Sequence, residues 1–358
     1  MFRTTALTEL LGIRLPLIQA PMAGGITTSR LITAVSNAGA LGSLAAALLS
    51  PEQIAAAVAE IRAGTERPFA VNLFVLEPVQ ADPAQLARAN ALLAPIRAEL
   101  GLPQPPVPER FAQDFAAQFD ALLEARPPVA SFTFGILDRD RMRALRQRGI
   151  VVIGTATTVA EARAWEAVGA DAVCAQGAEA GGHRGTFLGD FERALIGTMA
   201  LVPQVADAVR VPVIAAGGIM DGRGIAAALT LGAAGCQLGT AFLSCPEAAI
   251  PAGYKARLRQ ARDDETVVTR AFSGRPARGL FNDYLRRLQP HQHEFPPYPI
   301  QNALTGDIRR AAAAADRPDY LSLWAGQGAP MSRALPAAEL VATLAAETEQ
   351  ALAARNGL

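Results

Sequence analysis

The chain has 358 residues, of which 51% are apolar and 18% are charged, and its 33 basic residues balance 33 acidic ones. This composition argues against intrinsic disorder, because it supplies enough apolar surface for a large buried core. The zero net charge gives no reason to expect a nucleic acid or an anionic membrane as a partner. The length suits two average domains, or one α/β barrel of about 250 residues with additions.

The cysteines and the first residues favour a reducing cytoplasm. The chain has three cysteines, Cys174, Cys236 and Cys245, and no two of them form a CxxC motif. Neither a disulfide framework nor a zinc site is therefore predicted. The first residues, MFRTTALTELLGIRLP, lack the basic and then apolar design of a signal peptide. Two uncharged runs, Leu31–Pro51 and Ile225–Pro246, contain several small polar residues, so each is interpreted as helix plus strand rather than as a membrane span.

Short apolar or β-branched runs alternate with alanine-rich stretches along the chain. They are continuously apolar rather than alternating, which is typical of parallel strands covered on both faces. The predicted strands are Leu15–Met22, Ala40–Ala45, Phe69–Val75, Val129–Gly135, Ile150–Ala156, Ala172–Gly177, Val211–Ile219 and Gly235–Phe242.

Helix signals separate these strands. Ser50 and Gln53 have the spacing of a capping box before an alanine-rich run, and Thr158 and Glu161 repeat that spacing. Helix ends that need a left-handed residue are predicted at Gly64, Gly169 and Gly232. Eight strand–helix repeats in about 230 residues predict an α/β fold, a closed (β/α)8 TIM barrel. The alternative, a doubly wound open sheet, would need GxGxxG after its first strand, and APMAGGITTS lacks it.

Two regions lie outside the repeats. We expect the barrel to cover residues 1–245 with a helical insertion near 76–128, because that stretch is long and rich in Pro and Ala. Residues 246–330 hold much of the Tyr, Trp and His, and are predicted to form a helical subdomain that covers one barrel face and lines the substrate pocket. Residues 331–358 contain an Ala/Leu/Glu helix, which is expected to pack on the barrel.

Polar amides end two of the predicted strands. In a barrel the carboxyl ends of the strands meet at one mouth, where activity is built. Asn72 and Gln176 lie at such ends, and an amide side chain has both a donor and an acceptor for the edge of a heteroaromatic ring. The simpler interpretation is that each amide caps a loop. Because both stand at equivalent barrel positions, a bound ring is favoured.

Glycines follow the seventh strand and end the eighth. Gly217 and Gly218 allow backbone N–H groups to approach an anion, and Gly239 with Thr240 adds an N–H and a hydroxyl. Barrels often bind phosphate with the loops after strands seven and eight. Asp221 can cap the helix that follows, and helix starts favour anions. A phosphorylated cofactor is therefore predicted, the alternative being glycines that serve only as tight turns.

The sixth strand leads into AEAGGHRG, which contains one of only three histidines. We expect His183 to lie at the same barrel mouth, where an imidazole can act as a general acid or base or can bind an anion. A loop histidine is otherwise usually a solvated residue. His291 and His293 lack a third ligand in pattern, so they are interpreted as surface residues and no metal is expected. Cys174 and Cys236 are expected to be packing residues.

Five segments occur in order at spacings that suit one barrel: QAPMAGGI, AQGAEAGGHRGTF, AAGGIMDGRG, QLGTAFLSCPE and FSGRPARG. Together they resemble the nitronate monooxygenases, formerly called 2-nitropropane dioxygenases, of the class I-like kind. The likeness runs from about residue 10 to residue 330 and includes YPIQNALTGDIR and WAGQGA.

The resemblance implies an FMN-dependent enzyme that oxidises alkyl nitronates, propionate 3-nitronate above all, with O2. The products would be a carbonyl compound and nitrite or nitrate. The enzyme would serve in detoxification in the cytoplasm, and its oligomeric state would be a monomer or a homodimer. His183 matches the family's active-site histidine. No metal is needed, because flavin can pass single electrons to O2. The positions that match FMN contacts are Met22, Asn72, Gln176, Gly181, Gly218, Gln237, Leu238, Gly239 and Thr240.

Two alternatives stay open at this point. Flavin-dependent enoyl-acyl-carrier-protein reductases and NADH:quinone reductases share the AGGH-type motif and the barrel, although FSGRPARG and WAGQGA favour the nitronate branch. A flavin-binding protein without turnover is the alternative of a different class. Whether His183 moves a proton or only holds an anion is also open.

Overall fold

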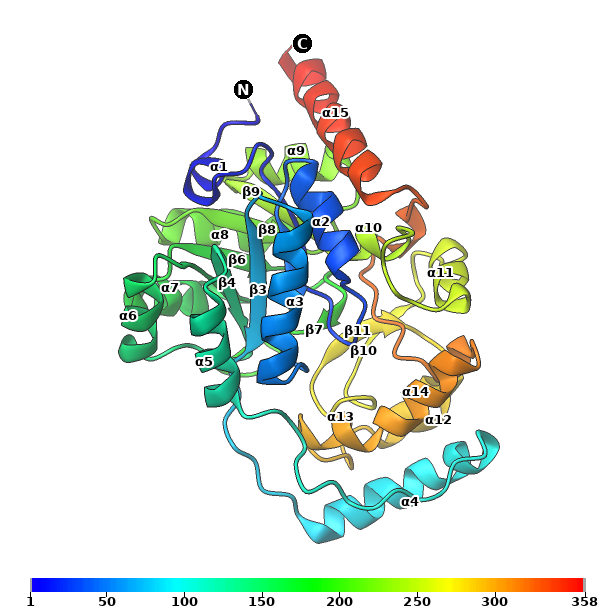
Figure 1. Cartoon of the computed structure of the whole chain (residues 1–358). Coiled ribbons are helices and arrows are strands. Elements are labelled where there is room, and N and C mark those ends of the chain that lie inside the picture. Colours follow the sequence, from blue (N-terminus) through cyan, green and yellow to red (C-terminus); the bar gives the residue numbers. More distant parts are fainter. Residues whose placement is uncertain (1, 357–358) are drawn as a thin grey trace.

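Eight strands run parallel in the order β1-β9-β8-β6-β5-β4-β3-β2, and a parallel bridge between Ile18 and Leu41 joins the two outer strands. The sheet therefore closes into the predicted (β/α)8 barrel (Figure 1), in a computed structural model that describes residues 2–356. The barrel strands are β1 (Leu17–Gln19), β2 (Gly42–Ala45), β3 (Phe69–Phe74), β4 (Val129–Thr133), β5 (Val151–Ala156), β6 (Ala172–Gln176), β8 (Val213–Ala216) and β9 (Gly235–Leu238).

All eight barrel strands lie within the predicted ranges, but most are shorter. The seventh strand ends before Gly217, since Gly217 and Gly218 take positive φ angles of 112° and 72° that a strand does not continue through. The eighth predicted strand is wrong beyond Leu238. Its last residues instead form a short helix, α10 (Thr240–Leu243), which begins directly after Gly239.

Helices cover the outside of the barrel, and their signals are mostly confirmed. The side chains of Ser50 and Gln53 form the capping box, while Gly169 and Gly232 are left-handed. Gly64 is not left-handed, and its small size instead makes room for Thr33. The outer helices are α1 (Ala6–Leu11), α2 (Ser29–Asn37), α3 (Pro51–Gly64), α5 (Phe115–Ala125), α6 (Arg139–Gln147), α7 (Val159–Val168), α8 (Thr198–Ala208) and α9 (Gly222–Thr230).

The second predicted capping box is only half formed. Thr158 caps the backbone N–H of Glu161, but the Glu161 carboxylate does not return to Thr158. It accepts hydrogen bonds from Thr157 and from the backbone N–H groups of Phe187 and Leu188. This buried carboxylate therefore ties the start of α7 to the loop that follows β6.

Side chains alternate between the inside and the outside of the barrel along its strands. On β6, Cys174 belongs to an inner cluster, whereas Val173 joins the cluster between the sheet and the helices. Leu7 of α1 lies in the inner cluster against Gly235, the first residue of β9, where a Cβ would come within 2.4 Å of it. Apolar packing thus fills the end of the barrel where the strands begin, and the opposite end remains for a site.

A second apolar core forms beyond that opposite end, from α4 and residues 243–329. Residues 246–330 are called the covering segment below. Arg97 of α4 (Pro83–Glu99) is buried, and its Nε donates to Oδ2 of Asp307 in α14 (Gly306–Ala314) at 2.8 Å. This ion pair joins the helical insertion to the covering segment. The elements here are α4 (Pro83–Glu99), α11 (Ala252–Arg259), β10 (Thr266–Thr269), β11 (Ala277–Leu280), α12 (Asp283–Leu288), α13 (Ile300–Leu304), α14 (Gly306–Ala314), and the 3-10 helices η1 (Gln289–His291), η2 (Pro318–Tyr320) and η3 (Ala329–Met331).

The covering segment is not purely helical, which the sequence does not predict. β10 and β11 pair antiparallel, and β11 also pairs with β7 (Gly182–His183), the short strand in the loop after β6. Ala277 faces His183 and Arg278 faces Gly182 in this pairing. Because β7 and β11 lie more than 90 positions apart in the sequence, no local sequence pattern predicts their pairing. None of the helices in residues 2–356 combines the length and apolar character of a bilayer crossing.

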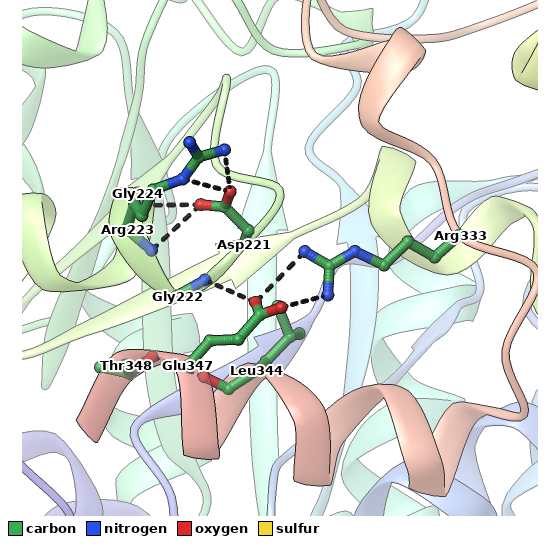
Figure 2. A network of polar contacts seen from close by, with 8 residues as sticks. All are labelled: Asp221, Gly222, Arg223, Gly224, Arg333, Leu344, Glu347 and Thr348. Carbon is green, nitrogen blue, oxygen red and sulfur yellow. Dashed lines mark hydrogen bonds and ion pairs between the residues drawn. The ribbon is translucent and has the colours of Figure 1, made fainter. Parts of the chain in front are cut away.

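The long C-terminal helix α15 (Ala337–Asn356) packs against α9 and α2 of the barrel. Figure 2 shows the polar joint between α15 and the start of α9. The Glu347 carboxylate accepts hydrogen bonds from the backbone N–H of Gly222 at 3.1 Å and from both terminal nitrogens of Arg333. Asp221 caps the same helix start from the other side, through the N–H groups of Arg223 and Gly224.

We predict that Glu347→Gln lowers the free energy of unfolding by about 1 kcal/mol, because it removes the charge from three hydrogen bonds at a half-buried site. Glu349→Gln is the matched control on the same helix, since Glu349 makes one exposed contact to Arg3. Urea unfolding of both variants checks this. Equal stability of the two variants would show that the joint contributes nothing.

Candidate functional site

A cavity of about 730 Å³ lies at the carboxyl ends of the barrel strands, between the barrel and the second core. Its walls come from both parts of the chain, which is the usual position of a barrel enzyme's site. The predicted site residues that line it are Met22, Asn72, Gln176, Gly181, His183, Gly218, Gln237, Gly239 and Thr240. Leu238 does not line it, because its side chain is buried in the core between sheet and helices.

The two amides at the strand ends differ in what they bind. Asn72 is buried and donates to the backbone oxygen and the hydroxyl of Ser131 at 3.1 and 3.0 Å. Gln176 uses both ends of its amide on the following loop: Nε2 donates to the His183 carbonyl at 3.0 Å and Oε1 accepts from Gly185 N–H at 2.8 Å. Gln176 therefore holds the loop that carries His183, which is the simpler of the two interpretations of its sequence position.

Arg184 anchors this loop from inside the protein. Its guanidinium is buried and donates to the carbonyl oxygens of Gly177, Gln176 and Ala194. Burial lowers the Arg184 pKa to about 10, and three carbonyl dipoles face its charge in place of a carboxylate. Together with the pairing of β7 and β11, this arginine fixes the backbone of the residue next to it, His183.

The His183 ring is held by the covering segment. Its Nε2 lies 2.8 Å from the hydroxyl of Ser273, which in turn donates to the carbonyl of Arg275 at 3.2 Å. A hydroxyl has one hydrogen, so the bond to the carbonyl assigns the donor role to His183 Nε2–H. Nδ1 then keeps its lone pair, and no group in residues 2–356 forms a hydrogen bond with it.

Burial, together with the nearby charges of Arg275 and Arg309, lowers the pKa of His183 to about 3. The imidazole is therefore neutral at neutral pH. A neutral ring with a free Nδ1 can accept a proton from a bound ligand.

Aromatic rings surround His183 on the cavity wall. Ring centroids of Phe134, Trp324 and Tyr298 lie 5.4, 5.5 and 5.6 Å from the imidazole centroid. Phe134 stacks on Phe74 and has a positive φ of 80°, which is strained for a residue with a side chain. The wall is rigid and apolar, so it excludes water from the side of His183.

The guanidinium of Arg275 keeps Phe134 in this conformation. It lies 3.8 Å from the centroid of the Phe134 ring, as a cation–π contact, and donates to the carbonyls of Arg184 and Thr186. Arg275 and Ser273 both belong to FSGRPARG, so this motif supports the histidine and the aromatic wall rather than contacting a ligand itself.

Glycines form another part of the cavity wall. Gly217, Gly218 and Gly239 line it, and Thr240 accepts a hydrogen bond from Gly326 N–H at 2.9 Å. The start of α9 does not offer free donors as the sequence suggests, because Asp221 and the Glu347 carboxylate already occupy its N–H groups. Donors for a ligand anion are therefore expected from the loops at Gly218 and Gly239.

Gly181 is needed for a reason that the sequence does not reveal. A Cβ at this position would come within 2.5 Å of Gly326 N and 2.6 Å of the Ala325 carbonyl carbon. The glycine thus makes room for the backbone of WAGQGA, which crosses over the loop, and not only for a ligand.

The charged groups of the cavity are all cationic. No Asp or Glu of the described residues lines it, whereas Arg309 and Arg310 of α14 do. Sequence analysis misses Ser273, Tyr298, Trp324 and Arg309, since each reaches the site only through the tertiary packing of the covering segment. No cluster of three metal-ligating side chains occurs in residues 2–356. The site thus favours an anionic ligand beside a neutral imidazole.

Comparisons with known proteins agree with this geometry. A family model described as nitronate monooxygenase matches residues 4–347. The chain is 47% identical to the nitronate monooxygenase of Pseudomonas aeruginosa over 350 residues, covering 96% of this chain and 99% of that protein. It is 43% identical to a probable nitronate monooxygenase of Staphylococcus saprophyticus, covering 90% of this chain and 92% of that protein.

Solved structures show the same fold over nearly the whole chain. The nitroalkane oxidase of Streptomyces ansochromogenes superposes with a TM-score of 0.91 at 43% identity and covers 98% of this chain and 99% of its own. FabK of Thermotoga maritima gives a TM-score of 0.78 at 30% identity, with 99% of each chain covered. The matches at 40% identity and above span the barrel, the insertion and the covering segment alike. The chain therefore belongs to the nitronate monooxygenase family of oxidoreductases.

Proposed function

We propose that the protein oxidises alkyl nitronates with O2, propionate 3-nitronate above all, to a carbonyl compound and nitrite or nitrate, as a detoxification reaction in the cytoplasm. The observation that carries this proposal is a cavity that no carboxylate of the described residues lines, in which a neutral His183 stands among aromatic rings beside a glycine-rich wall. A small organic anion suits this combination, because the arginines attract its charge and the rings exclude water.

The family is flavin-dependent, and the residues present fit FMN. The cavity volume, about 730 Å³, lies within the ordinary range for a bound cofactor. Gly218 and Gly239 line the cavity with backbone alone, so a phosphate can approach their N–H groups, and Thr240 adds a hydroxyl. Bound there, FMN would supply the electron transfer between substrate and O2. The residues that would hold it are Met22, Asn72, Gln176, Gly181, Gly218 and the stretch 237–240, in which Leu238 offers only its backbone.

The role of His183 follows from its tautomer. A nitronate is already an anion, so it needs orientation rather than deprotonation, and the Tyr298 hydroxyl on the cavity wall can supply that. A neutral nitroalkane must first lose a proton from the carbon that bears the nitro group. Nδ1 of His183 has the free lone pair for this step, while Ser273 holds the opposite side of the ring.

Oxygen uptake tests the proposal directly. We expect that purified protein is yellow, and that it consumes O2 when propionate 3-nitronate is added, with formation of nitrite or nitrate and a carbonyl compound. Flavin-loaded protein that consumes no O2 with this nitronate would contradict the proposed function.

The structural match to FabK favours a flavin-dependent NAD(P)H reductase as the second candidate. The acid-free cavity would also accept an anionic dinucleotide. In that case NADH, rather than a nitronate, would be the donor that supports turnover. A flavin protein inert toward both donors would instead support a function in binding alone.

We predict that His183→Asn retains FMN but lowers kcat/KM for a neutral nitroalkane by about 10²-fold or more, because the general base is lost. The nitronate of the same nitroalkane should lose far less activity, since it enters already deprotonated. Steady-state oxygen uptake with both forms measures the difference. An equal loss with both forms would mean that His183 binds the anion and does not move a proton.

We predict that Gly218→Val loses most of its FMN, because Gly218 lines the proposed phosphate position and a Cβ there already lies 3.3 Å from the Cβ of Glu179, so the branched side chain displaces this wall. Gly189→Val is the matched control: Gly189 has a similar φ of 77°, against 72° at Gly218, and a Cβ there meets no atom within 4 Å. Both changes cost about 1–3 kcal/mol of backbone strain. Flavin absorbance after reconstitution separates the two effects, and equal flavin content in both variants would refute the phosphate placement.

A further inference from the structure

Arg309 of α14 is a partly buried cation without an acidic partner. Its Nη2 donates to the backbone oxygen and the Oδ1 of Asn302 at 2.6 and 2.9 Å, and no carboxylate in residues 2–356 forms an ion pair with it. Burial lowers the pKa of Arg309. Removing a guanidinium from water without a counter-charge is costly, so its position calls for an anion that the protein itself does not supply.

Two other arginines near the site have structural partners. Arg184 donates to three backbone carbonyls, and Arg275 donates to two more while it stacks on Phe134. Neither lines the cavity, whereas Arg309 does. Its Nη1 has no hydrogen-bond partner among the described residues. Arg309 is therefore the partly buried guanidinium that remains available to a ligand.

The covering segment holds Arg309 in a fixed place. Arg97 of α4 bonds Asp307 at 2.8 Å and the Leu304 carbonyl at 2.7 Å, and so clamps the junction of α13 and α14 two residues before Arg309. The charge of Arg309 lowers the pKa of both His183 and Tyr298, which places it in the electrostatic field of the reaction centre. It does not contact His183, so a ligand can lie between them.

We propose that Arg309 binds a carboxylate at the end of the substrate remote from the nitronate, and thereby selects carboxyl-bearing nitronates over plain alkyl nitronates. This inference rests on the proposed function for the nitronate end of the ligand. A guanidinium with one free edge binds a carboxylate through charge-assisted hydrogen bonds. Asn302 keeps the plane of the guanidinium fixed, so the distance between Arg309 and the reaction centre sets the length of the preferred substrate.

The test compares propionate 3-nitronate with the nitronate of its methyl ester, which has the same chain without the carboxylate charge. In Arg309→Met holoenzyme, KM for the acid rises by about 10²-fold, while KM for the ester changes little. Arg309→Lys restores part of the preference, because it keeps the charge but not the two-pronged geometry. Arg317→Met is the matched control, an exposed arginine of the covering segment that does not line the cavity, and it leaves the ratio of the two KM values unchanged.

Equal losses for acid and ester would overturn the inference, because Arg309 would then act on the nitronate itself. An unchanged ratio in Arg309→Met would overturn it as well. Anaerobic calorimetric titration of 3-nitropropionate and its methyl ester into FMN-loaded His183→Asn protein, with and without Arg309→Met, measures the same preference without turnover. If wild type oxidises neither nitronate but binds the acid through Arg309, the proposed function fails while the carboxylate site stands.

Discussion

The pairing of Gly182 and His183 with Arg278 and Ala277 is the contact on which the site depends. It joins the loop after the sixth barrel strand to the covering segment, and it places Ser273 against His183. Gln176 and Arg184 hold the same loop from the barrel side through its backbone. The histidine is thus fixed by both halves of the chain, so a change in either half alters the orientation of its ring.

The electrostatics of the cavity follow from where the protein places its counter-charges. Carboxylates are used at helix starts and in the joints between elements, as Glu161, Glu347 and Asp307 show. None is left on the cavity wall within the described residues. Burial keeps His183 neutral, while Arg309 keeps its charge without a partner. The site therefore combines a neutral imidazole with a strong attraction for anions.

The sequence predicts the barrel well, because continuous apolar runs and helix caps are local signals. Strand ends are predicted less well. The predicted seventh strand runs through Gly217 to Ile219, although the positive φ of Gly217 ends it earlier, and the end of the eighth strand is missed because α10 has no distinct composition. His183 is found from its position after the sixth strand. Its partner Ser273 is not, because a hydrogen bond across 90 positions leaves no pattern in the chain.

The central claim is that this cavity takes electrons from a nitronate and not from a nicotinamide. The most direct measurement is the visible absorbance of the FMN-loaded protein after anaerobic mixing with propionate 3-nitronate or with NADH. The account predicts rapid loss of the oxidised flavin's absorbance with the nitronate and none on the same timescale with NADH. Rapid loss with NADH and none with the nitronate would contradict it and would identify the protein as a reductase.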